Sequence, residues 1–162
     1  MIGLGSLILA AKLCGAITGR EVPAPIACSA SLAIVATADG WPVETIAALA
    51  FSESRYNASK VNVRSGACGP MQTLYRPLSA HRRRCRAILA DAWLGYAAGV
   101  EKLRGASAFC ARLGDRSTLC MLAGYASGPA GVRGHWYVAP RKVLAHAEAI
   151  RLRMGLRPGG DV

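Results

Sequence analysis

The sequence A-F-S-E-S-R-Y-N at residues 50–57, followed by G-A-C-G-P-M-Q at residues 66–72, decides the fold of this chain. The first segment places Glu53 near the end of an apolar helical pattern, and the second is a glycine-rich turn that ends in a Met-Gln pair. Apolar surroundings disfavour the charged form of a carboxyl group and raise its pKa. Glu53 is therefore a candidate general acid of the kind that glycosidases use near neutral pH. The alternative is a surface glutamate at a helix end.

The pattern around these segments predicts a mainly α domain with a small irregular β or loop element after the helix that carries Glu53. Apolar spacing from Val43 to Ser54 predicts that helix, and Pro42 stands at its first turn. Residues 58–70 read as a loop or short hairpin. Further helices are expected at residues 26–38, 86–104, 117–126 and 140–153, with Gly128-Pro129 ending the third of these four.

The expected organisation has three parts: an apolar N-terminal segment and linker at residues 1–23, a domain at residues 24–154 and a tail at residues 155–162. Residues 1–19 are apolar apart from Lys12, so a signal peptide, a membrane span and a packing or anchoring helix are all open. We expect this segment to be dispensable for chemistry and needed for delivery. The alternative is a core segment joined to the domain by a disulfide between Cys14 and Cys28.

Charge and cysteine content limit the partners and the compartment. The chain has 20 Lys and Arg against nine acidic residues, a net charge of +11, which attracts polyanions such as the cell wall or nucleic acid. No zinc-finger, Walker A or nucleic-acid motif is present, so we expect no specific nucleic acid, no cofactor and no metal. The six cysteines form no C-x-x-C pair and suit disulfides in an oxidising compartment, with reduced buried thiols as the alternative. We expect Cys110–Cys120 as the first pair, and Cys68–Cys85 as a second.

Three sequence blocks resemble those of the soluble lytic transglycosylases and goose-type lysozymes. The blocks are E-S at residues 53–54, G-A-C-G-P-M-Q at residues 66–72 and G-Y-A-S-G-P at residues 124–129. They occur in the order E-S, G-A-x-G-L-M-Q, A-Y-N-A-G-P that the family uses, and the resemblance covers roughly residues 24–150. Pro70 replaces the usual Leu. Ala126 and Ser127 replace the usual Asn and Ala, which removes one hydrogen-bonding side chain.

The resemblance implies a lysozyme-like fold and roles for particular residues. Glu53 would be the catalytic acid and afterwards the base. The substrate-binding residues that it implies are Ser54, Gly69, Met71, Gln72 and Tyr125. Each has a structural alternative, because Ser54 can bond its own helix, Met71 and Tyr125 can be core residues, and glycines can serve the backbone.

The resemblance further implies a peptidoglycan lytic transglycosylase that cleaves between N-acetylmuramic acid and N-acetylglucosamine and leaves a 1,6-anhydro end. Because the muramic acid C6 hydroxyl is the nucleophile in that family, one carboxylate suffices. The alternatives are a hydrolase, for which Asp91 would be the first candidate base, a catalytically weak structural component, and a membrane-active cationic protein. The expected setting is a virion or the bacterial periplasm and envelope. The expected partners are peptidoglycan and a phage tail or envelope-spanning assembly, with membrane contact through residues 1–19 left open.

Overall fold

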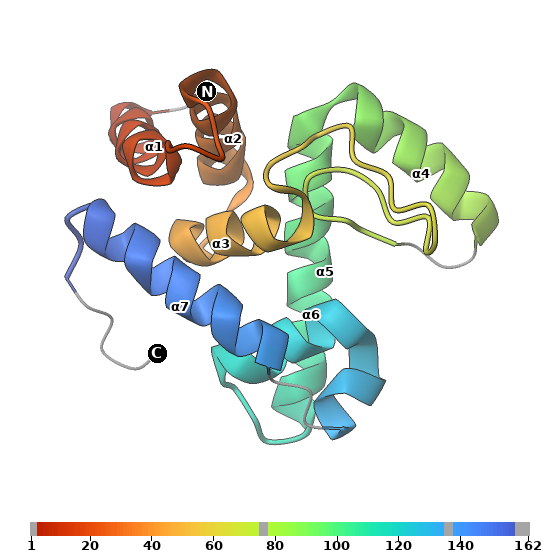
Figure 1. The fold of residues 1–162 in the computed structure, drawn as a ribbon. Coiled ribbons are helices and arrows are strands. Elements are labelled where there is room, and N and C mark those ends of the chain that lie inside the picture. The colour runs from red at the N-terminus through yellow and green to blue at the C-terminus, as the bar shows by residue number, and fades with distance from the viewer. Residues whose placement is uncertain (1–2, 75–77, 135–137, 158–162) are drawn as a thin grey trace.

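The structure is a computed structural model that describes residues 3–74, 78–134 and 138–157. Over these ranges the chain forms seven α-helices and no β-strand (Figure 1). The helices are α1 (Leu4–Ile17), α2 (Ala24–Thr37), α3 (Val43–Ser54), α4 (Leu78–Ala90), α5 (Ala92–Arg112), α6 (Thr118–Arg133) and α7 (Val138–Arg153). The expectation of a mainly α domain is confirmed.

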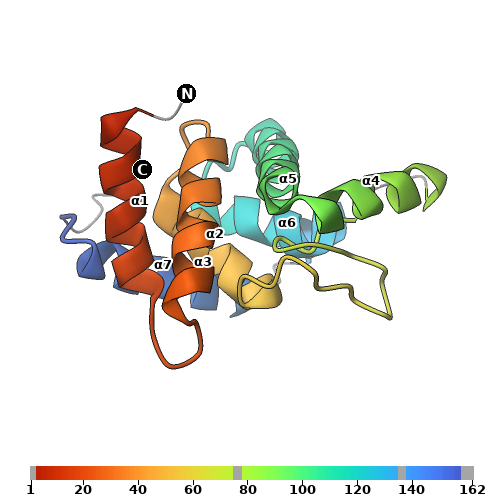
Figure 2. The same cartoon turned by 90° about the horizontal axis from the view of Figure 1, so that it is seen from above.

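Helix α3 is the central element of the fold. Every residue from Val43 to Ala50 is buried, because the segment is apolar on all sides apart from Glu44 and Thr45. Glu44 is paired with Arg151 of α7 at 3.2 Å, which compensates its charge. Helices α1, α2 and α7 pack against α3, while α5 packs against α2, α4 and α6 (Figures 1 and 2). The helix that carries Glu53 is therefore fixed by three neighbours.

The N-terminal segment forms a helix that packs into the core. Helix α1 lies along α2 and also contacts α7 (Figure 2). Leu13 is fully buried, and Cys14 is joined to Cys28 of α2 by a disulfide. This arrangement favours the alternative in which the segment is core rather than a detachable delivery element. Within the described residues no helix has the length and hydropathy needed to cross a membrane.

The segment between α3 and α4 is irregular, as the sequence predicts. Over residues 55–74 it contains two isolated antiparallel bridges, Val61 with Cys68 and Cys68 with Thr73, and no extended strand. Glycines and Asn62 turn the chain here, with the Asn62 side chain accepting from the backbone N–H of Arg64 and Ser65. The described part of this segment, residues 55–74, lies beside α5 and leads toward α4 (Figure 1).

Two of the predicted helices differ substantially from the structure. The single helix expected at residues 86–104 is wrong: α4 ends at Ala90, and Asp91 caps a new helix by accepting from the Trp93 N–H at 2.8 Å. Helix α6 continues past its predicted end, although Gly128 kinks it with φ 62° and ψ −160° before Pro129 restarts helical backbone. The predicted interruption at Gly128-Pro129 is present, but it kinks the helix and does not end it.

All six cysteines are paired. The disulfides are Cys14–Cys28, Cys68–Cys85 and Cys110–Cys120, so the expected first pair is confirmed along with the other two. Each links neighbouring elements: α1 to α2, the irregular segment to α4, and α5 to α6. Three disulfides favour an oxidising compartment. The predicted tail is described only to Arg157, and residues 158–162 lie outside the described residues.

Candidate functional site

Glu53 lies in the last turn of α3, where the chain makes a sharp change of direction. Arg55 ends the helix in the left-handed region, with φ 56°, and its N–H donates to the Phe51 carbonyl. The ammonium of Lys60 then donates to the Glu53 backbone carbonyl at 2.7 Å. A cation at the carboxyl end of a helix is favourable, because the last carbonyls carry partial negative charge. These contacts hold the backbone of Glu53 at a defined position.

The Glu53 side chain is half-buried, and this burial raises the pKa of its carboxyl group above the usual value. The charges of Lys102 and Lys60 act in the opposite direction and lower that pKa, but burial has the larger effect. A raised pKa keeps a carboxyl group protonated toward neutral pH, as a general acid requires. The electrostatic expectation from the sequence therefore holds for this residue.

Ser54 joins the first sequence block to the second. Its hydroxyl donates to the Pro70 carbonyl at 2.7 Å and also lies 3.2 Å from the carbonyl of Ala50 in its own helix. Ser54 is 5% exposed, so this bond forms in the protein interior. The turn at residues 66–72 is thereby fixed directly beside Glu53.

Tyr125 joins the third block to the second. Its hydroxyl donates to the Met71 carbonyl at 2.5 Å, and the ring is buried in α6. Ser54 and Tyr125 thus bond to consecutive carbonyls, those of Pro70 and Met71. The blocks at residues 53–54, 66–72 and 124–129 are therefore joined by these two hydrogen bonds, beside Glu53.

The glycine-rich turn needs its particular residues for steric reasons. Gly69 has φ +78°, and a Cβ at this position would lie 2.3 Å from Cγ2 of Ile88. Gln72 is also in the left-handed region, at φ 45°, and its amide donates to the carbonyls of Gly69 and Lys60 at 2.9 and 3.1 Å. The Gln72 side chain therefore links the turn to the backbone of Lys60, and the Lys60 ammonium in turn bonds to the Glu53 carbonyl.

The residues predicted to bind substrate all lie near Glu53, but their side chains are directed into the protein. Ser54, Met71, Gln72 and Tyr125 are buried, and the three polar ones bond to backbone carbonyls. This geometry favours a role in positioning Glu53 and the turn. Direct contact with a sugar remains a prediction for these residues. The departures at Ala126 and Ser127 lie on exposed surface.

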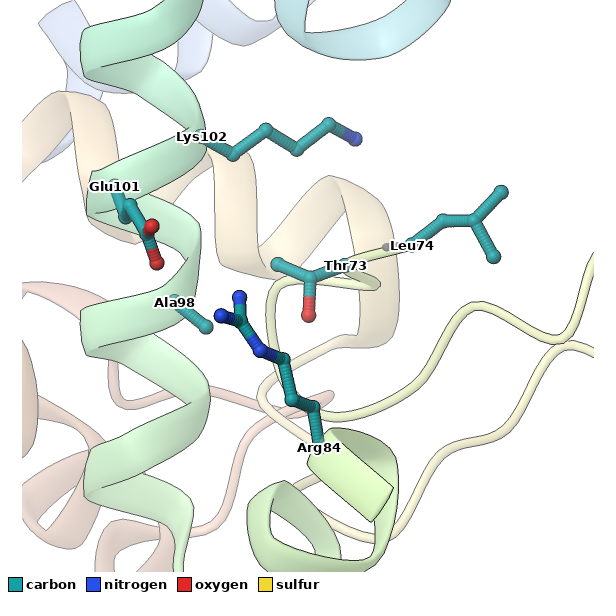
Figure 3. A pocket seen from close by; sticks show the side chains of 6 residues that line it. All are labelled: Thr73, Leu74, Arg84, Ala98, Glu101 and Lys102. Carbon is teal, nitrogen blue, oxygen red and sulfur yellow. The ribbon is translucent and has the colours of Figure 1, made fainter. Parts of the chain in front are cut away.

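A cavity of about 220 Å³ opens between α5, α4 and the end of the irregular segment (Figure 3). Its lining residues are Thr73, Leu74, Arg84, Ala98, Glu101 and Lys102. Glu53 does not line it, but Lys102 does, and Lys102 is the residue whose charge acts most strongly on Glu53. Sequence reasoning missed Lys102 and Thr73. The one feature of the sequence that could have pointed to Lys102 is its position beside the apolar face of the helix predicted at residues 86–104.

A larger cavity of about 540 Å³ lies between α2, the end of α3 and the start of α5. It is lined in part by Tyr56 and Tyr96, which are both buried. Neither hydroxyl has a hydrogen-bond partner among the described residues, and burial raises the pKa of both phenols. These hydroxyls therefore stay protonated. Tyr96 and Lys102 belong to different cavities on α5.

Two other groups of candidate residues have structural roles. Asp91, the first candidate for the base of a hydrolase, is the N-cap of α5. Cys68, His81 and Cys85 have ligating atoms within 4.8 Å of one another, but the two sulfurs are joined as a disulfide and His81 Nε2 lies 2.8 Å from the Gly66 carbonyl oxygen. The disulfide leaves this cluster no thiolate for a metal ion.

Neither a family model, nor a curated protein, nor a solved structure matches this chain. The site consists of the half-buried Glu53 carboxyl group with a raised pKa, a turn held by hydrogen bonds from Ser54 and Tyr125, and a cavity lined by Lys102, whose charge acts on Glu53. Such an arrangement can donate a proton to a bound group and then accept one.

Proposed function

We propose that this chain is a peptidoglycan lytic transglycosylase that cleaves the β-1,4 bond between N-acetylmuramic acid and N-acetylglucosamine. The observation that carries the proposal is the convergence of the three blocks on Glu53 through the Ser54–Pro70 and Tyr125–Met71 hydrogen bonds. A random set of short matches would have no reason to meet in space. The raised pKa of Glu53 supports the same reading.

In the proposed reaction Glu53 acts first as an acid. Its protonated carboxyl group gives the proton to the glycosidic oxygen, and the bond from that oxygen to C1 of muramic acid breaks. The resulting Glu53 carboxylate then takes the proton of the muramic acid C6 hydroxyl, whose oxygen bonds to C1. The products are a 1,6-anhydromuramic acid end and a free sugar hydroxyl. Glu53 returns to its protonated form, so no second carboxylate is needed.

The charges near Glu53 agree with a single-carboxylate reaction. The described groups whose charges shift its pKa are the two cations Lys102 and Lys60, and no second carboxylate is among them. A hydrolytic glycosidase normally uses two carboxyl groups, about 5–10 Å apart. The capping role of Asp91 removes the best sequence candidate for the second group. The transglycosylase reaction is thus preferred to hydrolysis.

The proposed setting is outside the cytoplasm, in a virion or in the periplasm and envelope. Three disulfides and a net charge of +11 suit a protein that works in an oxidising environment on an anionic wall. In such a setting the chain would open the wall locally as part of a larger assembly, with peptidoglycan as substrate and no specific nucleic acid.

The Glu53→Gln variant tests the proposal. The amide is nearly isosteric with the carboxyl group but neither donates the acid proton nor acts as the base. Because general acid–base help is worth roughly 10²–10⁴-fold, we expect release of soluble fragments from purified peptidoglycan to fall by at least about 10²-fold. Glu148→Gln, the same change at an exposed position on α7, serves as the control and should keep full activity. Near-normal activity in a folded Glu53→Gln protein would reject Glu53 as the catalytic residue.

A further inference from the structure

Lys102 is placed where its charge can act on both the cavity and Glu53. It projects from α5, is half-buried, and its Nζ lies 4.2 Å from the centre of the Tyr125 ring. A cation over the face of an aromatic ring is held there by the ring's quadrupole. The hydroxyl of the same ring is bonded to the Met71 carbonyl. The ammonium therefore lies against the same ring whose hydroxyl bond joins the third block to the second.

The charge of Lys102 is not compensated by a close carboxylate. Among the described residues no Asp or Glu oxygen lies within ion-pair distance of its ammonium. Figure 3 shows the Arg84 and Glu101 side chains directed toward each other, whereas Lys102 extends away from Glu101, past Thr73 toward Leu74. Partial burial of an unpaired ammonium costs free energy. The cavity therefore carries a cation that a bound anion would stabilise.

A second hydrogen-bond donor lines the same cavity. Thr73 is 2% exposed, and its hydroxyl has no hydrogen-bond partner among the described residues. Its backbone is fixed, because its N–H and carbonyl both bond to Cys68, at 3.0 and 3.1 Å. Buried polar groups normally find a partner, so an unpartnered hydroxyl in a cavity wall points to a ligand or a water molecule.

We propose that the cavity between α4 and α5 is a subsite for a carboxylate group on the muramic acid side of the substrate, and that Lys102 is its ligand. This inference rests on the proposed function. Peptidoglycan offers carboxylates of two kinds: those of the stem peptide, and the lactyl carboxylate of muramic acid where the peptide has been removed. Sugar hydroxyls and amides are neutral and give no reason for an unpaired ammonium. A volume of about 220 Å³ accommodates a small acidic group rather than a whole peptide.

Occupation of this subsite would also act on the acid. The cations that lower the Glu53 pKa are Lys102 from α5 and Lys60 from the irregular segment. A carboxylate bound to Lys102 offsets one of these charges, so the Glu53 pKa rises further when substrate is in place. Binding would thereby favour the protonated acid at the moment when the proton is required.

The test compares three soluble glycan strands: one with free stem-peptide carboxylates, one with those carboxylates converted to amides, and one without peptides. Wild-type protein should cleave the free-carboxylate strand with a kcat/KM about tenfold above that for the amidated strand. Lys102→Met should lose this preference, and Lys102→Arg should keep most of it. Lys142→Met, the same change at an exposed position on α7, should behave as wild type.

The pH profile supplies a second readout. Lys102→Met removes a charge that lowers the Glu53 pKa, so the alkaline limb of kcat/KM should move to higher pH. A purely structural role for Lys102 would lower activity without moving this limb. The strand without peptides identifies the source of the carboxylate. If cleavage of this strand depends on Lys102, the lactyl group is the source. If it is independent of Lys102, the stem peptide is the source.

Equal cleavage of the free and amidated strands by wild-type protein, together with cleavage of the peptide-free strand that does not depend on Lys102, would overturn the subsite. An equal loss on both strands in Lys102→Met, with an unmoved pH profile, would overturn it as well. If the wild-type protein cleaves none of the strands, the proposed function is rejected independently of the subsite. The subsite is then tested by measuring the binding of the same strands by calorimetry. A preference for free carboxylates that Lys102→Met abolishes then supports it, and the absence of a preference rejects it.

Discussion

At the scale of single residues, the site depends on which buried polar groups have partners. Tyr125 and Tyr96 are both about 1% exposed, but only the Tyr125 hydroxyl makes a hydrogen bond that positions the turn beside Glu53. A buried polar group without a partner costs free energy, whereas removal of such a group costs nothing. The two tyrosines therefore form a matched pair in which the same substitution has different consequences.

Tyr125→Phe leaves the Met71 carbonyl without its side-chain donor, so we expect the free energy of unfolding to fall by about 1–3 kcal/mol. The activity should fall as well, because the turn is no longer fixed on its α6 side. Tyr96→Phe removes a hydroxyl that has no partner among the described residues, and its free energy of unfolding should stay within about 0.5 kcal/mol of wild type or rise. Urea denaturation of both variants measures the difference. An equal loss in the two proteins would contradict the assigned hydrogen bond.

The residues of the candidate site were only partly predictable from the sequence. Glu53 and Ser54 were recognisable because a short motif carries them, and the pKa direction of Glu53 followed from the apolar helix around it. The burial of Met71 and Tyr125 was foreseen as an alternative to substrate contact. Lys102 was not predictable, because its importance comes from the packing of α5 against α6, which no local pattern reports.

At the scale of elements, the irregular segment between α3 and α4 determines the geometry of the site. It has no regular strand in its described part, so side-chain bonds and steric fit replace a hydrogen-bonded ladder. The sequence predicted this loop because glycines and Asn62 dominate it. The boundary between α4 and α5 was missed, since Asp91 interrupts an otherwise continuous helical pattern and only its capping bond reveals the break.

Gly69 and Gly114 illustrate two different reasons for a glycine in a turn: a left-handed backbone and a lack of space for a Cβ atom. Both have positive φ, +78° and +79°, but only at Gly69 would a Cβ meet a neighbour, the Ile88 side chain at 2.3 Å. Gly114→Ala should therefore cost about 1 kcal/mol for the left-handed backbone alone. Gly69→Ala should cost about 1–3 kcal/mol more through overpacking, and should lower activity by displacing the turn.

Thermal or urea denaturation of the two alanine variants, together with a peptidoglycan cleavage assay, provides the measurement. Gly114 lies between α5 and α6, outside the three blocks, so its variant should retain activity once folded. If Gly69→Ala proved no less stable than Gly114→Ala, the close packing of the turn against α4 would be incorrect.

At the scale of the whole molecule, three disulfides and one central helix hold the parts of the site together. Cys14–Cys28 joins α1 to α2, Cys68–Cys85 joins the irregular segment to α4, and Cys110–Cys120 joins α5 to α6. Composition predicted disulfides, and the positions of the cysteines along the chain pointed to the three pairs that form, with Cys14–Cys28 foreseen only as an alternative. The sequence does not report which elements are neighbours, so the apolar N-terminal segment could be read as a delivery element, although α1 contributes Leu13 to the core.

The net charge of +11 belongs to this scale as well, because a cationic surface attracts polyanions and this attraction is screened by salt. In the proposed reaction Glu53 alone serves as acid and base while the muramic acid C6 hydroxyl is the nucleophile. That claim concerns the chemical identity of the product.

Mass spectrometry of purified peptidoglycan digested with the protein tests this claim most directly. Muramic acid ends that carry a 1,6-anhydro bridge are one water molecule lighter than reducing ends, and we predict that the new ends are of the anhydro kind. The Glu53→Gln protein should release neither kind. Reducing muramic acid ends would contradict the account and identify a hydrolase, with a second carboxyl group still to be found, and an undigested wall would contradict the enzyme assignment itself.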